Sequence, residues 1–150
     1  MAGKGSITTM AIRVNHLDTA ALITAAEAAA DHAYAPYSRA MVGCALVSEA
    51  GNLYRGCNVE NASFGLTICA ERNAIFAGVA AEGAGFKVAS LAVIARGLEF
   101  PPCGACRQVI AEFAEADTPV SFMSEGRVKT MTLSELLPAS FVFDPIQRSS

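Results

Sequence analysis

Residues 101–113, with the sequence PPCGACRQVIAEF, decide how this chain is organised. Two prolines interrupt the chain here, because proline cannot continue a helix or a central strand. A helix is predicted from Cys103 to about Ala114, so Cys103 and Cys106 form a C-x-x-C pair at its start. The free backbone N–H groups and the partial positive charge of a helix N-terminus stabilise thiolates. The stretch therefore predicts two sulfur atoms that can bind one metal ion.

A third sulfur stands 34 residues earlier, where Cys69 opens another predicted helix that runs to about Ala81. Three protein ligands with one open position are typical of a catalytic zinc site, whereas four are typical of a structural one. Glu71 follows two residues after Cys69, and positions i and i+2 of a helix do not share a face. Glu71 is thus poorly placed to bind the same ion and well placed to reach a water in its open position. Alternatively, an acidic residue in a first turn only complements the helix dipole.

Other readings of these cysteines stay open at this level. A lone C-x-x-C is also typical of redox pairs, and a purely structural zinc site is a further alternative. Four residues remain candidates for a fourth ligand, although a buried cysteine that merely packs is the commoner case. These are His16, His32, Cys44 and Cys57.

The remaining elements are predicted from caps, apolar runs and turn residues. Asp18 is expected to cap a helix that continues to about Tyr34, and Pro36 cannot continue it. The order helix, strand, strand, helix, strand, helix, strand, strand, helix favours an α/β sheet covered on both faces. Strands are expected over residues 41–47, 53–59, 91–95, 120–123 and 128–132, and a short last helix over 133–137.

Composition limits the classes of partner. The 150 residues fit one domain over 16–150 after a loose, glycine-containing tail over 1–15. The net charge is −3 and the basic residues are scattered, which argues against a nucleic-acid partner. No apolar run approaches the roughly 18–20 residues of a membrane span, and no signal-peptide pattern is present. We therefore expect a cytoplasmic protein, and an odd count of five cysteines there favours metal or thiol chemistry over disulfides.

Five segments in order resemble the small homotetrameric cytidine deaminases, and ligand-x-Glu followed by Pro-Cys-x-x-Cys is the signature of zinc deaminases. The resemblance implies a three-layer α/β/α sandwich around a mixed five-stranded sheet. It implies hydrolysis of cytidine and 2′-deoxycytidine to the uridines plus ammonia, as in pyrimidine salvage. It also implies one Zn²⁺ per subunit and a homotetramer whose subunits share active sites. The matching segments are residues 34–39, 56–61, 69–72, 102–109 and 135–138.

The resemblance also implies roles for individual residues. Cys69, Cys103 and Cys106 would bind the metal, Glu71 would carry protons, and Arg72 would donate to a cysteine sulfur. Asn58 and Glu60 match the pair that holds the sugar 3′-hydroxyl in that family, and their spacing at a strand end puts both side chains on one face. The substrate-binding set is Asn58, Glu60, Ala62, Phe64, the backbone N–H of Ala70, and Phe141 from another subunit.

Three positions depart from the family pattern. Ala40 stands where family members usually carry a pocket-lining Phe, Phe64 where some have Tyr, and Pro101 where a small hydroxyl residue is common. The change at Ala40 leaves an alternative substrate open, a modified cytosine nucleoside or a nucleoside antibiotic. A second alternative, from another class, is a non-catalytic binding subunit stabilised by zinc.

Overall fold

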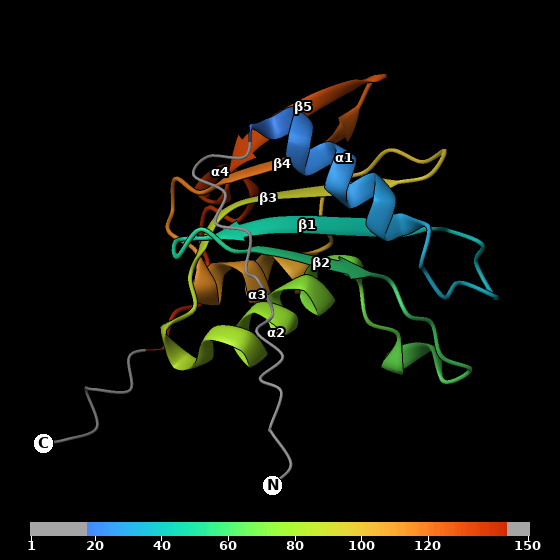
Figure 1. Ribbon diagram of the computed structural model, residues 1–150, viewed down its shortest axis with the longest axis horizontal. Coiled ribbons are helices and arrows are strands. Elements are labelled where there is room, and N and C mark those ends of the chain that lie inside the picture. The colour runs from blue at the N-terminus through green and yellow to red at the C-terminus, as the bar shows by residue number, and fades with distance from the viewer. Residues whose placement is uncertain (1–17, 144–150) are drawn as a thin grey trace, which may run out of the picture.

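The computed structural model describes residues 18–143, and their elements follow the predicted order (Figure 1). Asp18 caps the first helix, as predicted, because its carboxylate accepts a hydrogen bond from the backbone N–H of Ala21 at 2.8 Å. The helices are α1 (Thr19–Ala30), α2 (Ala70–Glu82), α3 (Gly104–Phe113) and α4 (Leu133–Leu136), with short 3₁₀ turns η1 (Phe64–Leu66) and η2 (Gly83–Gly85). The strands are β1 (Val42–Ser48), β2 (Leu53–Cys57), β3 (Val88–Ala95), β4 (Pro119–Ser124) and β5 (Arg127–Thr132).

The strands form one mixed five-stranded sheet in the order β2-β1-β3-β4-β5. The β1–β2 hairpin, the β1–β3 pair and the β4–β5 hairpin are antiparallel, while β3 and β4 are parallel. A parallel pair needs a crossover, and α3 provides it between β3 and β4. This crossover carries the C-x-x-C pair.

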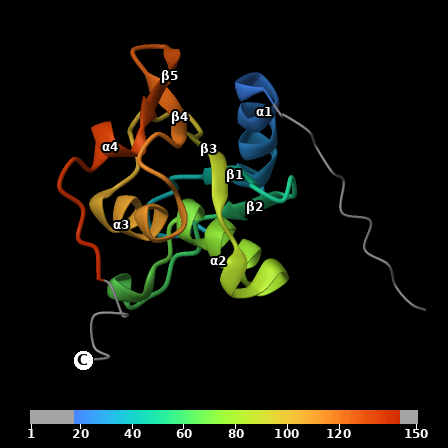
Figure 2. The same ribbon diagram turned by 90° about the vertical axis from the view of Figure 1, so that its left-hand side faces the viewer.

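Helices lie on both sides of the sheet, with α1 on one face and α2 and α3 on the other (Figures 1 and 2). Successive side chains of a strand point to opposite faces, and β1 follows this rule. Cys44 and Leu46 belong to the core under α2 and α3, whereas Ala45 and Val47 belong to the core under α1. The arrangement confirms the predicted three-layer α/β/α sandwich.

Two glycines allow helices to lie directly on the strands. A Cβ atom at Gly43 of β1 would lie 1.9 Å from the carbonyl oxygen of Ala26 in α1. A Cβ atom at Gly56 of β2 would lie 2.4 Å from the backbone nitrogen of Ala74 and 2.5 Å from the carbonyl oxygen of Ala70, both in α2. Glycine is required at both positions because backbone approaches backbone there.

The C-terminal end of α2 is tied to the β1–β2 hairpin. One carboxylate oxygen of Glu82, the last residue of α2, accepts three side-chain hydrogen bonds. The donors are Ser48 Oγ at 2.6 Å, Asn52 Nδ2 at 2.8 Å and Tyr54 Oη at 3.0 Å. α2 is thus held at both ends against the hairpin.

The prediction that the first helix continues to Tyr34 is wrong. α1 ends at Ala30, and the backbone of Tyr34 is used in pairing instead. Its N–H donates to the carbonyl of Asn58 at 3.0 Å, and its carbonyl accepts from the N–H of Glu60 at 2.8 Å. This pairing follows β2, which ends at Cys57 rather than at the expected residue 59. Long-range backbone pairing therefore outweighs local helix propensity here.

Two expectations concern other parts of the chain. The predicted tail over residues 1–15 and His16 lie outside the described residues, so they stay predictions. Within residues 18–143, no helix combines the length and the apolar character needed to cross a bilayer.

Candidate metal centre

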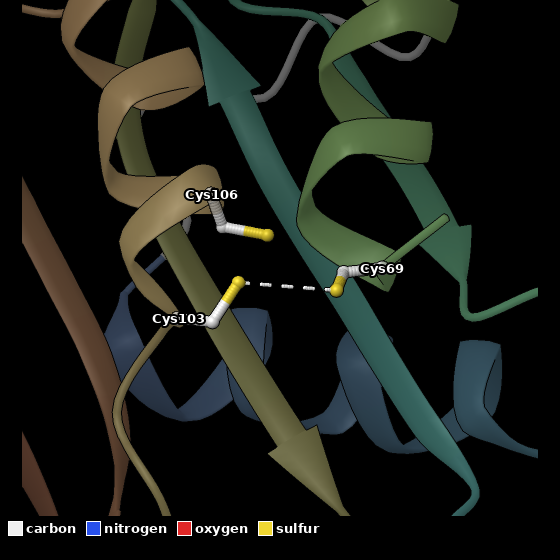
Figure 3. Close-up of side chains that lie close together, drawn as sticks. All are labelled: Cys69, Cys103 and Cys106. Carbon is white, nitrogen blue, oxygen red and sulfur yellow. Dashed lines mark hydrogen bonds between the residues drawn. The ribbon is translucent and has the colours of Figure 1, made fainter. Parts of the chain in front are cut away.

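The N-termini of α2 and α3 bring three cysteines together (Figure 3). Cys69 and Cys103 are the N-cap residues of these helices, with extended backbones at ψ 157° and 165°. Neither side chain caps its own helix. Both sulfur atoms point instead into the space between the helices, where Cys106 joins them from the first turn of α3.

The spacing of the sulfur atoms fits a metal rather than a disulfide. Cys69 Sγ and Cys103 Sγ lie 4.0 Å apart, and all three sulfur atoms lie within 4.8 Å of one another. A disulfide requires about 2.05 Å. Zn–S bonds of about 2.3 Å in a tetrahedral site place two sulfurs about 3.8 Å apart. The donor set is therefore that of a three-thiolate zinc centre, and a two-cysteine redox pair does not explain the third sulfur.

The thiols are electrostatically coupled. Hydrogen bonding from Cys106, and then from Arg72, lowers the pKa of Cys69 to about 5 against the opposing effect of burial. The pKa of Cys106 is raised, because its hydrogen bond to Cys69 favours its protonated form and because it is buried. Cys69 therefore ionises before Cys106. A metal must displace the proton that Cys106 retains, so binding at this centre is pH-dependent.

Glu71 is buried in the first turn of α2, with 3% of its surface exposed. Burial raises the pKa of its carboxyl to about 7, and the neighbouring charge of Cys69 adds to this effect. Among the described His, Cys, Asp and Glu residues, only the three cysteines group as a ligand set, so Glu71 lies beside the centre without joining it. A carboxyl that titrates near neutral pH can both accept and return a proton.

Arg72 faces the same sulfurs. Its Nη2 donates to Cys69 Sγ at 3.2 Å, and this hydrogen bond raises the pKa of the guanidinium further above its usual range. Its Nε is buried without an acceptor among the described residues, which is uncommon for a buried donor. Such a donor fits a centre that takes up a further polar group.

None of the described candidates for a fourth ligand reaches the cluster. Cys44 is fully buried in the core between β1 and the helices, and burial raises the pKa of its thiol well above the usual value. Cys57 ends β2, and His32 is exposed just after α1. Within residues 18–143 the centre therefore offers three ligands, which would leave one position open on a tetrahedral ion.

Asn58 and Glu60 both face residues 37–42. The side chain of Asn58 accepts from the N–H of Val42 at 2.9 Å and donates to the carbonyl of Ala40 at 2.8 Å. One donor hydrogen and one acceptor position of its amide remain for a ligand. The carboxylate of Glu60 accepts from the backbone N–H of Tyr37 at 2.8 Å and from the hydroxyl of Ser38. The hydrogen bond from Ser38 lowers the pKa of Glu60, so this carboxylate is held charged.

Sequence reasoning missed Ser38 as a functional candidate. Its hydroxyl donates to Glu60 and accepts from the N–H of Ala40 at 3.0 Å, so it orients the carboxylate. A cavity of about 380 Å³ lies here, lined by Tyr37, Ser38, Glu60, Phe64 and Thr67. The only signal in the sequence was the position of Ser38 within the segment 34–39 that carries the resemblance.

The other predicted substrate-binding residues differ in exposure. Ala70 is fully buried directly after Cys69, and Ala62 is exposed in the loop before η1. Phe64 is 73% exposed and contacts Tyr37 edge-on, with ring centroids 5.7 Å apart. Phe141 is 71% exposed, and its carbonyl accepts from Gln108 Nε2 of α3 at 3.0 Å. Their roles toward a substrate stay predictions.

Comparison with known proteins agrees with this chemistry. Residues 18–122 match the family described as "Cytidine and deoxycytidylate deaminase zinc-binding region". A cytidine deaminase from Halalkalibacterium halodurans is 48% identical over 126 residues, which cover 83% of this chain and 95% of that protein. The crystal structure of a cytidine deaminase from Burkholderia pseudomallei superposes with a TM-score of 0.77 at 44% identity, covering 83% of this chain and all of that one. The cytidine deaminase of Mycobacterium tuberculosis superposes with a TM-score of 0.74 at 36% identity, covering 85% of this chain and all of that one.

Proposed function

Because the chain belongs to the cytidine and deoxycytidylate deaminase zinc-binding family, we propose that it hydrolyses cytidine and 2′-deoxycytidine. The products are uridine or 2′-deoxyuridine and ammonia. The observation that carries the proposal is the buried Glu71 beside three converging cysteine sulfurs at the starts of α2 and α3. The relatives named as cytidine deaminases favour this activity over a modified nucleoside substrate and over a non-catalytic subunit.

Cys69, Cys103 and Cys106 would hold the zinc, which when bound would supply a water whose pKa is near 7 instead of about 15.7. Glu71 takes a proton from the attacking water and passes it to N3 of the cytosine ring. As the water oxygen bonds to C4, Glu71 takes the second proton from that oxygen and passes it to the amino group, so that the C4–N bond breaks and ammonia leaves. A single carboxylate can serve all these transfers because its pKa lies near neutrality.

Arg72 adjusts the charge of the centre. Three thiolates give the zinc site a formal charge of −1, which weakens the metal as a Lewis acid. The hydrogen bond from Arg72 to Cys69 Sγ draws electron density from that sulfur. Arg72 thus offsets the third thiolate.

The nucleoside is held by residues on either side of the base. Asn58 and Glu60 bind the 3′-hydroxyl of the sugar, using the amide capacity that the contacts with residues 40–42 leave free. The backbone N–H of Ala70 binds the base oxygen O2, and Ala62 and Phe64 line the pocket. Phe141 packs on the pyrimidine of a neighbouring subunit in a homotetramer, which its 71% exposure in the single chain supports.

The cellular setting follows from this chemistry. Deamination of free nucleosides is a step of pyrimidine salvage. The five cysteines include no disulfide pair, which accords with the reducing cytoplasm. We place the single catalytic domain over residues 16–150, after the tail of residues 1–15.

The test is the variant Glu71→Gln, which keeps the shape of the side chain and removes the base. We expect one zinc per subunit, as in wild type, with kcat for cytidine lowered by about 10²- to 10⁴-fold. Turnover is measured by the loss of ultraviolet absorbance of the cytosine ring, and zinc by elemental analysis. Glu112→Gln, an exposed change on α3, is the matched control and retains wild-type turnover. Normal turnover by Glu71→Gln would show that another group carries the proton.

Substrate breadth needs a separate panel of cytidine, 2′-deoxycytidine and N4-substituted analogues. We expect both unmodified nucleosides to be consumed. If cytidine is inert while an analogue turns over, the substrate assignment is wrong and the small side chain of Ala40 becomes its first explanation.

A further inference from the structure

Arg107, the residue after the metal ligand Cys106, contacts two segments far apart in sequence. Its Nε donates to the carbonyl of Pro102 at 2.7 Å, and its Nη1 donates to the carbonyl of Leu136 at 2.7 Å. The side chain is half-buried on α3. Both acceptors are backbone carbonyls.

The first contact fixes the residue that precedes a metal ligand. Pro102 is fully buried, and its ring restricts φ. With its side chain enclosed and its carbonyl held by a guanidinium, the peptide that joins Pro102 to Cys103 has little freedom. Cys103 itself is exposed, so its own side-chain packing does not fix its sulfur in place.

The second contact joins the same helix to α4. Leu136 is the last residue of α4, and the last carbonyls of a helix lack partners within the helix. Arg107 satisfies one of them, while Leu133 and Leu136 pack into the core that also contains Ile110 of α3. The planar guanidinium holds its donors in a fixed relation, which suits two carbonyls at once.

We propose that Arg107 is a positioning residue of the metal centre. It clamps the Pro102–Cys103 segment and the end of α4 to α3, and so keeps Cys103 and Cys106 in register with Cys69. This role rests on the proposed zinc-dependent function, but it concerns metal retention and requires no substrate.

The test measures zinc release from the loaded protein into an excess of a chromogenic chelator, without nucleoside. We expect Arg107→Gln to release zinc at least about tenfold faster than wild type, at the lower end of the effects of residues that orient metal ligands. Arg107→Lys keeps the charge but cannot span both carbonyls, so it also releases zinc faster. The lysine variant serves if the glutamine variant does not fold.

Two controls separate positioning from general loss of stability. Ile110→Val removes one buried methyl group from the same helix without touching Pro102 or Leu136, and Arg127→Gln removes an exposed arginine from β5. Both should release zinc at close to the wild-type rate. Equal release rates for Arg107→Gln and wild type would overturn the proposal, and so would equally fast release from Ile110→Val at a matched thermal midpoint. A wild-type chain that retains no zinc would overturn the proposed function itself, and the clamp with it.

Discussion

Gly56 offers a direct test of how the fold positions the metal centre. In Gly56→Ala, the new Cβ would lie 2.4–2.5 Å from backbone atoms of Ala74 and Ala70 in α2. Ordinary contact begins at 3.4 Å, so α2 must move away from β2 by about 1 Å. Neither side can yield by changing a side-chain rotamer, because both the strand and the helix present backbone here.

The displacement would reach the candidate metal centre because Cys69 is the N-cap of α2 and Glu71 lies in its first turn. Overpacking of this kind costs about 1–3 kcal/mol of stability, and a misplacement of about 1 Å near reacting groups costs about 10²-fold in rate. The hydrogen bond from Asn73 Nδ2 to the carbonyl of Cys57, now 2.8 Å, would also stretch. We therefore expect a lower thermal midpoint together with loss of zinc and of turnover.

The assay compares thermal unfolding, zinc content and kcat/KM of Gly56→Ala with those of Gly85→Ala. A Cβ at Gly85 meets no atom within 4 Å, so this control should match wild type in all three measurements. Activity is measured well below the thermal midpoint, so that unfolding does not contribute. Wild-type zinc content and turnover in Gly56→Ala would refute the reasoning, because they would show that the centre tolerates a shifted α2.

Three further predictions concern other contacts. Arg72→Ala should accelerate zinc release and lower kcat, because Cys69 Sγ loses its charged donor; chelator competition checks this, and wild-type release would refute the role of Arg72. Burial raises the pKa of Glu82, but three hydrogen bonds from the β1–β2 hairpin outweigh it, so the net pKa lies below its ordinary value. Glu82→Gln should therefore lower the free energy of unfolding by about 1–3 kcal/mol at pH 7, and by progressively less as the pH falls through the carboxyl's pKa. Urea unfolding across that pH range checks this, and a loss of stability that is independent of pH would contradict it. Phe141→Ala should raise KM for cytidine about tenfold, as expected for loss of one aromatic–base contact, with zinc content unchanged; an unaltered KM would exclude Phe141 from the pocket.

Much of the fold was accessible from local signals. Asp18 as a cap, the strand β1 and the helix starts near Cys69 and Cys103 depend on neighbouring residues, so the sequence predicts them well. The end of α1 was mispredicted because it depends on a remote segment. Residues 31–35 contain no proline or glycine, and the backbone of Tyr34 pairs with residues 58–60 instead of continuing the helix.

Some features of the candidate site were likewise predictable from the sequence, and others required the structure. By itself the sequence predicted the donor chemistry, because Cys69, Cys103 and Glu71 at the starts of two predicted helices indicated a metal site with a nearby base. Only the tertiary structure decided which sulfurs meet, since Cys44 and Cys57 are equally cysteines but lie outside the cluster. Only the tertiary structure showed the two contacts of Arg107, because both acceptors are backbone carbonyls. Every residue carries such a carbonyl, so the sequence does not indicate which of them a side chain reaches. The identity of each residue fixes its side-chain chemistry, whereas folding decides which distant segments come into contact.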